Sequence, residues 1–224
     1  MSDARFWNKA AERYARQPVA NPEAFERKIE VTLSRMTPQS VVLDIGCGTG
    51  SLALRLAPSA GHVHGLDVST EMIRIARRKT SDARVDNVSF HVGAFDDSFA
   101  VFDEASLDGI CAYSLLHLLE NRQAALARIH RLLKPGGFFV ASTVCLGESR
   151  LPFAPLLWLM RRLGMAPKVS VLDKRTHEIE VAKAGFVDLV QPDVGVKPTI
   201  MFLTATKPLT TPCRDEQPDM APLP

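Results

Sequence analysis

Residues 41–50, Val-Val-Leu-Asp-Ile-Gly-Cys-Gly-Thr-Gly, constrain the fold of this chain more than any other stretch. An apolar, β-branched run ends at the carboxylate of Asp44, and glycines follow at positions 46, 48 and 50. Good helix formers with an apolar face come next, at 51–57. This pattern predicts a buried strand, a tight turn and the start of a helix. Glycine permits a positive φ and lets a ligand approach bare backbone, and a helix N-terminus offers free N–H groups, so the turn is suited to holding a small ligand.

The spacing of these glycines separates two classes of ligand. A dinucleotide fingerprint reads G-x-G-x-x-G, and counting from Gly46 places Ser51 where the third glycine belongs. The pattern D-x-G-x-G-x-G fits without a gap, from Asp44 to Gly50. A second expected strand ends at Asp67, 17 residues after Gly50. A carboxylate there can accept hydrogen bonds from both hydroxyls of a ribose, or it can cap the following helix. The turn and the acid together predict a nucleoside-binding α/β domain.

These motifs resemble the first motifs of the class I S-adenosylmethionine-dependent methyltransferases. The stretch Ser114–Leu119 and the Leu-Lys-Pro-Gly-Gly run at 133–137 also resemble that family. The resemblance covers roughly residues 6–208, and the layout is similar to that of the quinone- and sterol-methylating branch. It implies S-adenosyl-L-methionine as the cofactor and in-line transfer of its methyl group to a small-molecule acceptor.

The resemblance also implies a set of cofactor-binding residues. After the third strand the family commonly has Gly-Asp-Ala, in which the Asp accepts a hydrogen bond from the adenine amino group, whereas this chain has Ala94 after Gly93. Asp96, Asp97 or the backbone of Ala94 and Phe95 would then read the base. The residues implied for cofactor binding are Asp44, Gly46, Cys47, Gly48, Gly50, Asp67, Val68, Met72, Ala94, Phe95, Tyr14 and Ser114.

Alternating strand and helix patterns predict the fold class. Strands expected at 41–45, 62–67, 87–92, 107–113 and 138–144 alternate with helical segments. Such alternation requires an α/β fold with a doubly wound, mostly parallel sheet and right-handed crossovers. Further helices are expected at 23–36 and 173–184. The last two strands are expected at 186–190 and 199–206, and the resemblance implies that they pair antiparallel.

His117 is the titratable side chain in the apolar run after the fourth strand. Ligands of open α/β sheets bind at the carboxyl ends of the strands, so His117 is a candidate general base and acceptor contact, with Glu148 as a second base. The alternative is a partly buried histidine satisfied by backbone groups. A base is needed only where the acceptor is a hydroxyl, an acidic carbon or a protonated amine.

Residues 5–36 lie outside the alternation and read as two helices. One interpretation is a packing element that covers one end of the sheet. The other is a lid, in which Tyr14 contacts the cofactor and Trp7 contacts the acceptor.

Residues 146–170 form an apolar insertion after the fifth strand. Leu151–Met160 is almost wholly apolar, and ten such residues are too few to span a bilayer. The sheet, an apolar acceptor, a second subunit or a membrane surface could cover this segment. Its position after the fifth strand favours the acceptor, with Phe153 and Trp158 as expected contacts.

Composition limits the remaining possibilities. Residues 1–207 are expected to form a single domain, and the Pro-rich polar tail at 208–224 is expected to be disordered. A net charge of +2 provides no basic field for nucleic acid. The four cysteines are scattered, without a metal-binding spacing, which favours reduced thiols in the cytoplasm and no metal. Neither a secretory signal nor an apolar run of membrane-spanning length is evident.

Three other functions fit parts of the sequence. An NAD-type oxidoreductase would need the third glycine and a proton-donating dyad. A nucleic-acid base methyltransferase would usually show an Asn/Asp-Pro-Pro-aromatic run where this chain has residues 112–115, Ala-Tyr-Ser-Leu. A nucleoside-binding module without catalysis would keep the glycine turn and lack the acceptor pocket.

Overall fold

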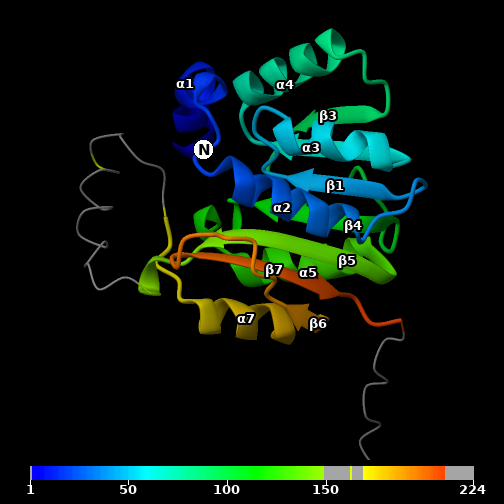
Figure 1. The fold of residues 1–224 in the computed structure, drawn as a ribbon, viewed down its shortest axis with the longest axis vertical. Coiled ribbons are helices and arrows are strands. Elements are labelled where there is room, and N and C mark those ends of the chain that lie inside the picture. The colour runs from blue at the N-terminus through cyan, green and yellow to red at the C-terminus, as the bar shows by residue number, and fades with distance from the viewer. Residues whose placement is uncertain (1, 149–161, 163–168, 210–224) are drawn as a thin grey trace, which may run out of the picture.

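A seven-stranded sheet forms the middle of the molecule in the computed structural model, which describes residues 2–148, 162 and 169–209 (Figure 1). The strand order is β3-β2-β1-β4-β5-β7-β6. The strands are β1 Val41–Ile45, β2 His62–Asp67, β3 Val88–Val92, β4 Leu107–Tyr113, β5 Leu133–Val144, β6 Val187–Val190 and β7 Ile200–Thr206.

Helices cover both faces of this sheet, because each face carries apolar side chains that must be buried. One core cluster joins the sheet to Ile29, Leu52 and Ile73, and the cluster on the other face includes Leu126 and Val181. The helices are α1 Ser2–Arg16, α2 Pro22–Leu33, α3 Ser51–Leu56, α4 Thr70–Asp82, α5 Arg122–Leu132 and α7 Lys174–Lys183, with short 3-10 turns at Ala57–Ser59, Leu116–Leu118 and Leu146–Glu148.

The pairing of the strands confirms the predicted fold class. Strands β3, β2, β1, β4 and β5 pair in parallel, whereas β7 is antiparallel to both β5 and β6. Because β1 lies between β2 and β4, the strand order reverses there, and the connections after β1 and β4 diverge. Such a switch point opens a crevice at the carboxyl ends of the strands.

Two predicted boundaries differ from the structure by three residues or more. Helix α2 ends at Leu33 rather than at residue 36, and β5 begins at Leu133 rather than at residue 138. The residue after α5, Leu133, is already extended, with φ −70° and ψ 140°, and it pairs with Leu107. The Lys-Pro-Gly-Gly run is therefore part of the sheet margin, where the Gly136 N–H donates to the Lys207 carbonyl at 2.9 Å.

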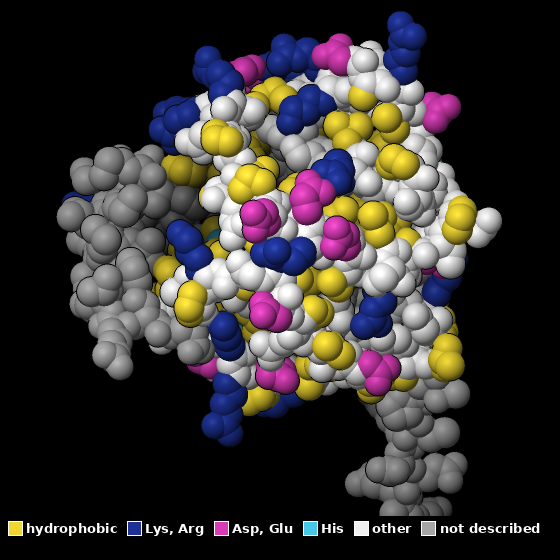
Figure 2. Space-filling view, in the orientation of Figure 1, with side chains coloured by type: hydrophobic (Ala, Val, Ile, Leu, Met, Phe, Trp, Pro, Cys, Tyr) yellow, Lys and Arg dark blue, Asp and Glu magenta, His cyan; other side chains and the backbone are white. Residues whose placement is uncertain are grey.

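Most of the predicted apolar insertion and of the predicted tail lies outside the described residues, and so do Phe153 and Trp158. Within the described ranges, no helix is long and apolar enough to cross a membrane. Figure 2 shows acidic, basic and apolar side chains interspersed over one face of the molecule, without a large area of a single charge sign.

Three histidines lie side by side at the β2–β3 side of the sheet. His64 Nδ1 is 3.3 Å from His91 Nε2, and the rings of His62 and His64 are 4.4 Å apart between centroids. Burial, together with the neighbouring His62 and His91, lowers the pKa of His64 from 6.5 to about 4. His64 is therefore neutral in the folded protein at neutral pH.

We expect acid to destabilise the fold partly through His64. As the pH falls from about 6.5 to about 4, the unfolded chain binds a proton at this residue and the folded chain does not, so the free energy of unfolding decreases. His64→Gln should reduce that loss by on the order of 1 kcal/mol after allowance for solvent screening. Urea unfolding at pH 7.5 and 5.0 measures both proteins, and equal losses would contradict the expectation.

Candidate functional site

A cavity of about 830 Å³ lies at the carboxyl ends of β1, β2 and β4. Its walls come from the glycine turn after β1, the connection after β2, the segment after β3 and the turn after β4. Residues of α1 and α5 also contribute to the wall. The cavity therefore occupies the switch-point crevice, where the sequence predicts a nucleoside-sized ligand.

The three glycines of the turn have different surroundings, although all have positive φ: 71° at Gly46, 53° at Gly48 and 75° at Gly50. A Cβ on Gly46 would lie 2.9 Å from Leu115, and one on Gly50 would lie 2.8 Å from Phe90. A Cβ on Gly48 would meet only Tyr14, at 3.9 Å. Gly48 therefore exposes bare backbone to the cavity, whereas the other two are needed for close packing as well as for the turn.

Asp67 connects two walls of the cavity. Its Oδ2 accepts from the Gly48 N–H at 2.9 Å, and its Oδ1 accepts from the Ser69 N–H at 2.8 Å. Burial raises the pKa of this carboxyl, and the two backbone donors oppose that shift. A carboxylate oxygen has two lone pairs, so each oxygen can accept one further hydrogen bond from a ligand hydroxyl.

Asp44 lies behind the turn and is 1% exposed. Its Oδ2 is buried without a hydrogen-bond partner, and burial, with Asp67 nearby, raises its pKa well above the usual value. Burial and the same two acids also raise the pKa of the Cys47 thiol, so Cys47 is not a thiolate nucleophile. The bare backbone at Gly48 and the remaining lone pairs of Asp67 fit a ligand that carries a ribose.

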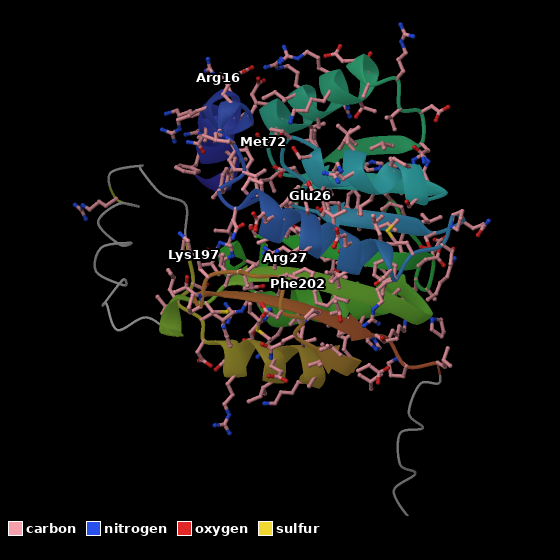
Figure 3. All side chains as sticks on the ribbon, viewed as in Figure 1. Arg16, Glu26, Arg27, Met72, Lys197 and Phe202 are labelled. Atoms are coloured by element: carbon pink, nitrogen blue, oxygen red, sulfur yellow. The ribbon has the colours of Figure 1, made fainter. Side chains whose placement is uncertain are left out.

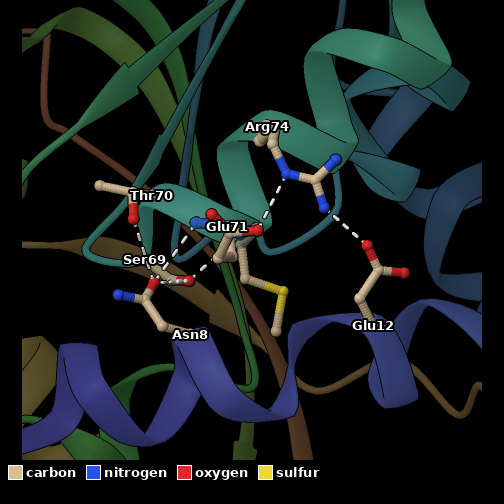
Figure 4. A network of polar contacts seen from close by, with 7 residues as sticks. Asn8, Glu12, Ser69, Thr70, Glu71 and Arg74 are labelled. Carbon is tan, nitrogen blue, oxygen red and sulfur yellow. Dashed lines mark hydrogen bonds and ion pairs between the residues drawn. The ribbon is translucent and has the colours of Figure 1, made fainter.

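Helix α1 is fastened to the start of α4, as Figure 4 shows. Asn8 Oδ1 accepts from the Ser69 hydroxyl at 2.7 Å and from the Glu71 N–H at 3.3 Å. Glu12 pairs with Arg74 at 2.6 Å. These contacts tie α1 to the helix that follows Asp67.

Apolar contacts extend this attachment to the cavity wall. Trp7 packs against the cluster of Ala11, Met72 and Ile75, and Figure 3 shows Met72 near α1. Trp7 also meets Tyr14 edge to face, with ring centroids 6.3 Å apart. Helix α1 thus presents two aromatic rings to the cavity beside Gly48.

The turn after β4 holds the candidate base. Ser114 has φ 56°, a strained value for a residue with a Cβ, and its N–H donates to the Ser142 carbonyl at 2.7 Å. His117 follows on the cavity wall and is 7% exposed. Burial lowers the pKa of His117 to about 4, with a further contribution from His177. His117 is therefore neutral at pH 7, the form that can accept a proton.

The segment after β3 lies where the family commonly has an Asp that accepts a hydrogen bond from the adenine amino group. Ala94, Phe95, Asp96 and Asp97 all reach the cavity wall. Asp96 Oδ1 is occupied by the N–H and hydroxyl of Ser98, at 3.0 and 2.5 Å. The segment is also held from α5, because Arg128 pairs with Asp97 at 3.0 Å and its guanidinium lies 5.4 Å from the Phe95 ring centroid.

The cavity brings together most of the residues named from the sequence. Asp44, Cys47 and Gly50 are not on its wall, since Asp44 and Cys47 are buried behind the turn and Gly50 packs against Phe90. Among the described residues, no group of three or more His, Cys, Asp or Glu side chains could hold a metal ion. The named residues that line the cavity are Trp7, Tyr14, Gly46, Gly48, Asp67, Val68, Met72, Ala94, Phe95, Ser114 and His117.

Sequence reasoning missed the wall contributed by α5 and the preceding turn. Asn121, Ala124 and Arg128 lie on one side of α5 and reach the cavity. In the sequence they read as a helix cap, a core position and a surface charge, and no local signal marks them as wall residues. The apolar lining residues missed in the same way include Leu66, Leu115, Leu118 and Leu119.

Comparison with known proteins points to one kind of protein. Residues 42–137 match a family described as a methyltransferase domain. The chain is 30% identical over 186 residues to the O-methyltransferase resE of Aspergillus sclerotiorum, covering 81% of this chain and 68% of that protein. It is 31% identical over 137 residues to a ubiquinone biosynthesis O-methyltransferase of Xylella fastidiosa, covering 61% of this chain and 52% of that protein.

A solved structure shows the same fold at lower identity. Phosphoethanolamine N-methyltransferase 2 of Haemonchus contortus, in complex with S-adenosyl-L-methionine, superposes with a TM-score of 0.68 and 19% identity. The match covers 82% of this chain and 53% of that one. The chain therefore spans about two thirds of the first of these three proteins and about half of the other two.

The surroundings of the glycines predict that a substitution at Gly48 mainly affects ligand binding and that one at Gly50 mainly affects stability. Gly48→Val should abolish nucleoside binding because its side chain would enter the open cavity, and its cost in stability should come from the positive φ rather than from a packing clash. Gly50→Ala should mainly destabilise the protein, since its Cβ would meet Phe90 and Ala76. Calorimetric titration with S-adenosylhomocysteine and thermal unfolding separate the two effects. A folded Gly48→Val protein with normal affinity would contradict the assignment of Gly48.

Proposed function

Because the chain belongs to the class I S-adenosylmethionine-dependent methyltransferases, we propose that it methylates a small, apolar or amphipathic acceptor. The observation that supports this proposal is the continuous cavity, in which the glycine turn and Asp67 lie at one side and His117 among apolar residues at another. Both curated relatives described above are named as O-methyltransferases, which favours a hydroxyl as the acceptor group.

The chain's own residues have separate roles in holding the cofactor. Gly48 leaves room for close approach to the backbone, and Asp67 accepts from the ribose hydroxyls with its remaining lone pairs. Val68, Met72 and Phe95 supply apolar wall for the adenine. S-adenosylmethionine, when bound, supplies an electrophilic methyl group on a positively charged sulfur.

The rate of methyl transfer depends chiefly on how the acceptor and the cofactor are held relative to each other. Walls from α1 and α5 hold the reactants together and exclude water, which supplies much of the rate in such transfers. A hydroxyl acceptor must lose its proton, and we propose that the neutral ring of His117, on the cavity wall, receives it. The aromatic rings of Trp7 and Tyr14 form another part of the wall, which is the basis for proposing α1 as a lid.

The same proposal extends to the apolar insertion and to the location of the protein. The apolar insertion at 146–170, with Phe153 and Trp158, is proposed to contact the acceptor, with peripheral membrane contact as the alternative. The scattered cysteines support a cytoplasmic location. A binding module without catalysis is the second candidate, and it differs by binding S-adenosylmethionine without turnover.

Loss of the second acid should weaken cofactor binding. Asp67→Ala removes charge-assisted hydrogen bonds and the support of the Gly48 and Ser69 N–H groups, which should cost about 1.5–3 kcal/mol of binding free energy. Calorimetry with S-adenosylhomocysteine measures the loss, and Asp82→Ala, at the last residue of the helix that follows Asp67, is the matched control. Unchanged affinity in Asp67→Ala, or tight binding of NAD by the wild type, would refute the cofactor assignment.

The acceptor is testable with labelled cofactor. Wild-type protein should transfer radiolabelled methyl groups to apolar phenols or other hydroxyl compounds, and Trp158→Ala should lower kcat/KM for the acceptor while the cofactor affinity stays the same. Thin-layer separation of the products detects the transfer. Cofactor binding without transfer to any fraction of a small-molecule extract would favour the binding module instead.

A further inference from the structure

The side chain of Arg128 connects α5 to the segment after β3. Its Nη1 donates to Asp97 Oδ1 at 3.0 Å, and its Nη2 donates to the Phe99 carbonyl. The guanidinium also lies 5.4 Å from the centroid of the Phe95 ring, within the range of a cation–π attraction. Arg128, Phe95 and Asp97 all lie on the cavity wall. One side chain of α5 therefore holds a stretch of wall that has no regular secondary structure of its own.

The contacts of Arg128 differ in how well they are shielded from water. Asp97 is 91% exposed, so solvent screens its ion pair with Arg128, whose own side chain is 11% exposed. Phe99 is buried and Phe95 packs against the core, so the other two contacts are better shielded. The Nε of Arg128 is buried without a hydrogen-bond partner, which is unfavourable for the fold. The stability of the fold therefore does not explain an arginine at this position, and its contacts point to a role at the cavity.

The order of the strands places the base of the cofactor beside the segment after β3. Asp67, at the end of β2, is the proposed acceptor for the ribose hydroxyls, and its carbonyl accepts from the Gly93 N–H at 2.9 Å. The base and the chain that leads to the sulfur leave a ribose ring on opposite sides. The sulfur must reach the β4 side of the cavity, where His117 lies, so the base extends toward β3, the other neighbour of β2.

We propose that Arg128 is a positioning residue for the base of the cofactor: it fixes the segment after β3 so that the backbone of Ala94 and the ring of Phe95 contact adenine. This inference rests on the proposed function. Ala94 has no polar side chain, and the Oδ1 atoms of Asp96 and Asp97 are already engaged within the protein. Backbone groups then read the edge of the base, and they can do so only where the backbone is held in place.

The test measures how well the protein distinguishes two bases. Titration calorimetry gives the Kd of S-adenosylhomocysteine and that of S-inosylhomocysteine, in which an oxygen replaces the adenine amino group and reverses the hydrogen-bonding pattern of the edge. In Arg128→Gln the Kd of S-adenosylhomocysteine should rise about tenfold and that of S-inosylhomocysteine much less, because the backbone that reads the edge is no longer fixed. The preference for adenine should therefore fall.

Asp97→Asn provides a second variant that changes an exposed side chain and should leave the fold intact. It weakens only the screened contact of Arg128, so the Kd of S-adenosylhomocysteine should rise by less, about threefold. The preference for adenine should fall in the same direction as in Arg128→Gln. This variant carries the test if Arg128→Gln does not fold.

Two comparisons separate positioning of the base from packing. Arg131 on the same helix also approaches Asp97, at 3.5 Å, but lies outside the cavity wall, so Arg131→Gln should leave both Kd values unchanged. Combining Arg128→Gln with Phe95→Ala should cost less binding free energy than the sum of the two single effects, since both substitutions remove the same contact.

A purely structural role for Arg128 predicts a different result. Thermal unfolding of Arg128→Gln at a lower temperature, with the wild-type ratio of the two Kd values, would overturn the inference. Equal rises in both Kd values would also overturn it, as would a wild type that binds the two ligands equally well. Absence of methyl transfer by a wild type that prefers S-adenosylhomocysteine would instead contradict the proposed function, because these titrations do not measure turnover.

Discussion

The cavity depends on the two hydrogen bonds that the carboxylate of Asp67 accepts from backbone N–H groups. One oxygen holds the glycine turn after β1 and the other holds the start of α4, so the two loops form one wall. Ser69 then caps α4 and donates to Asn8, which brings α1 against the same wall. A single acid at the end of β2 thus connects the ligand-binding turn to the helix that covers it.

Burial determines the charge state of the groups around the cavity. On the β1 side it raises the pKa values of Asp44 and Cys47, and on the β4 side it lowers that of His117. All three shifts favour the uncharged form, because a low-dielectric surrounding disfavours charge. Burial raises the pKa of Asp67 as well, although its two backbone donors reduce the shift.

The glycine turn shows how one motif combines packing with binding. All three glycines have positive φ, so each is needed for the backbone path. Gly46 also packs closely against Leu115, just after β4, and Gly50 packs closely against Phe90 in β3. Only at Gly48 does the missing side chain leave open space. The sequence pattern assigns one role to all three residues, and the packing separates them.

Short-range patterns in the sequence determined the strand–turn–helix at 41–56, the acid at the end of β2 and the mostly parallel sheet, because hydrophobic periodicity and glycine chemistry act locally. Those patterns also placed the residues of three cavity walls at the carboxyl ends of their strands. The wall from α5 and the Arg122–Glu180 ion pair were decided only by the tertiary structure. These two residues, 58 positions apart, come together through the packing of α5 and α7 against one face of the sheet, and the packing of distant helices leaves no periodic signal in the chain.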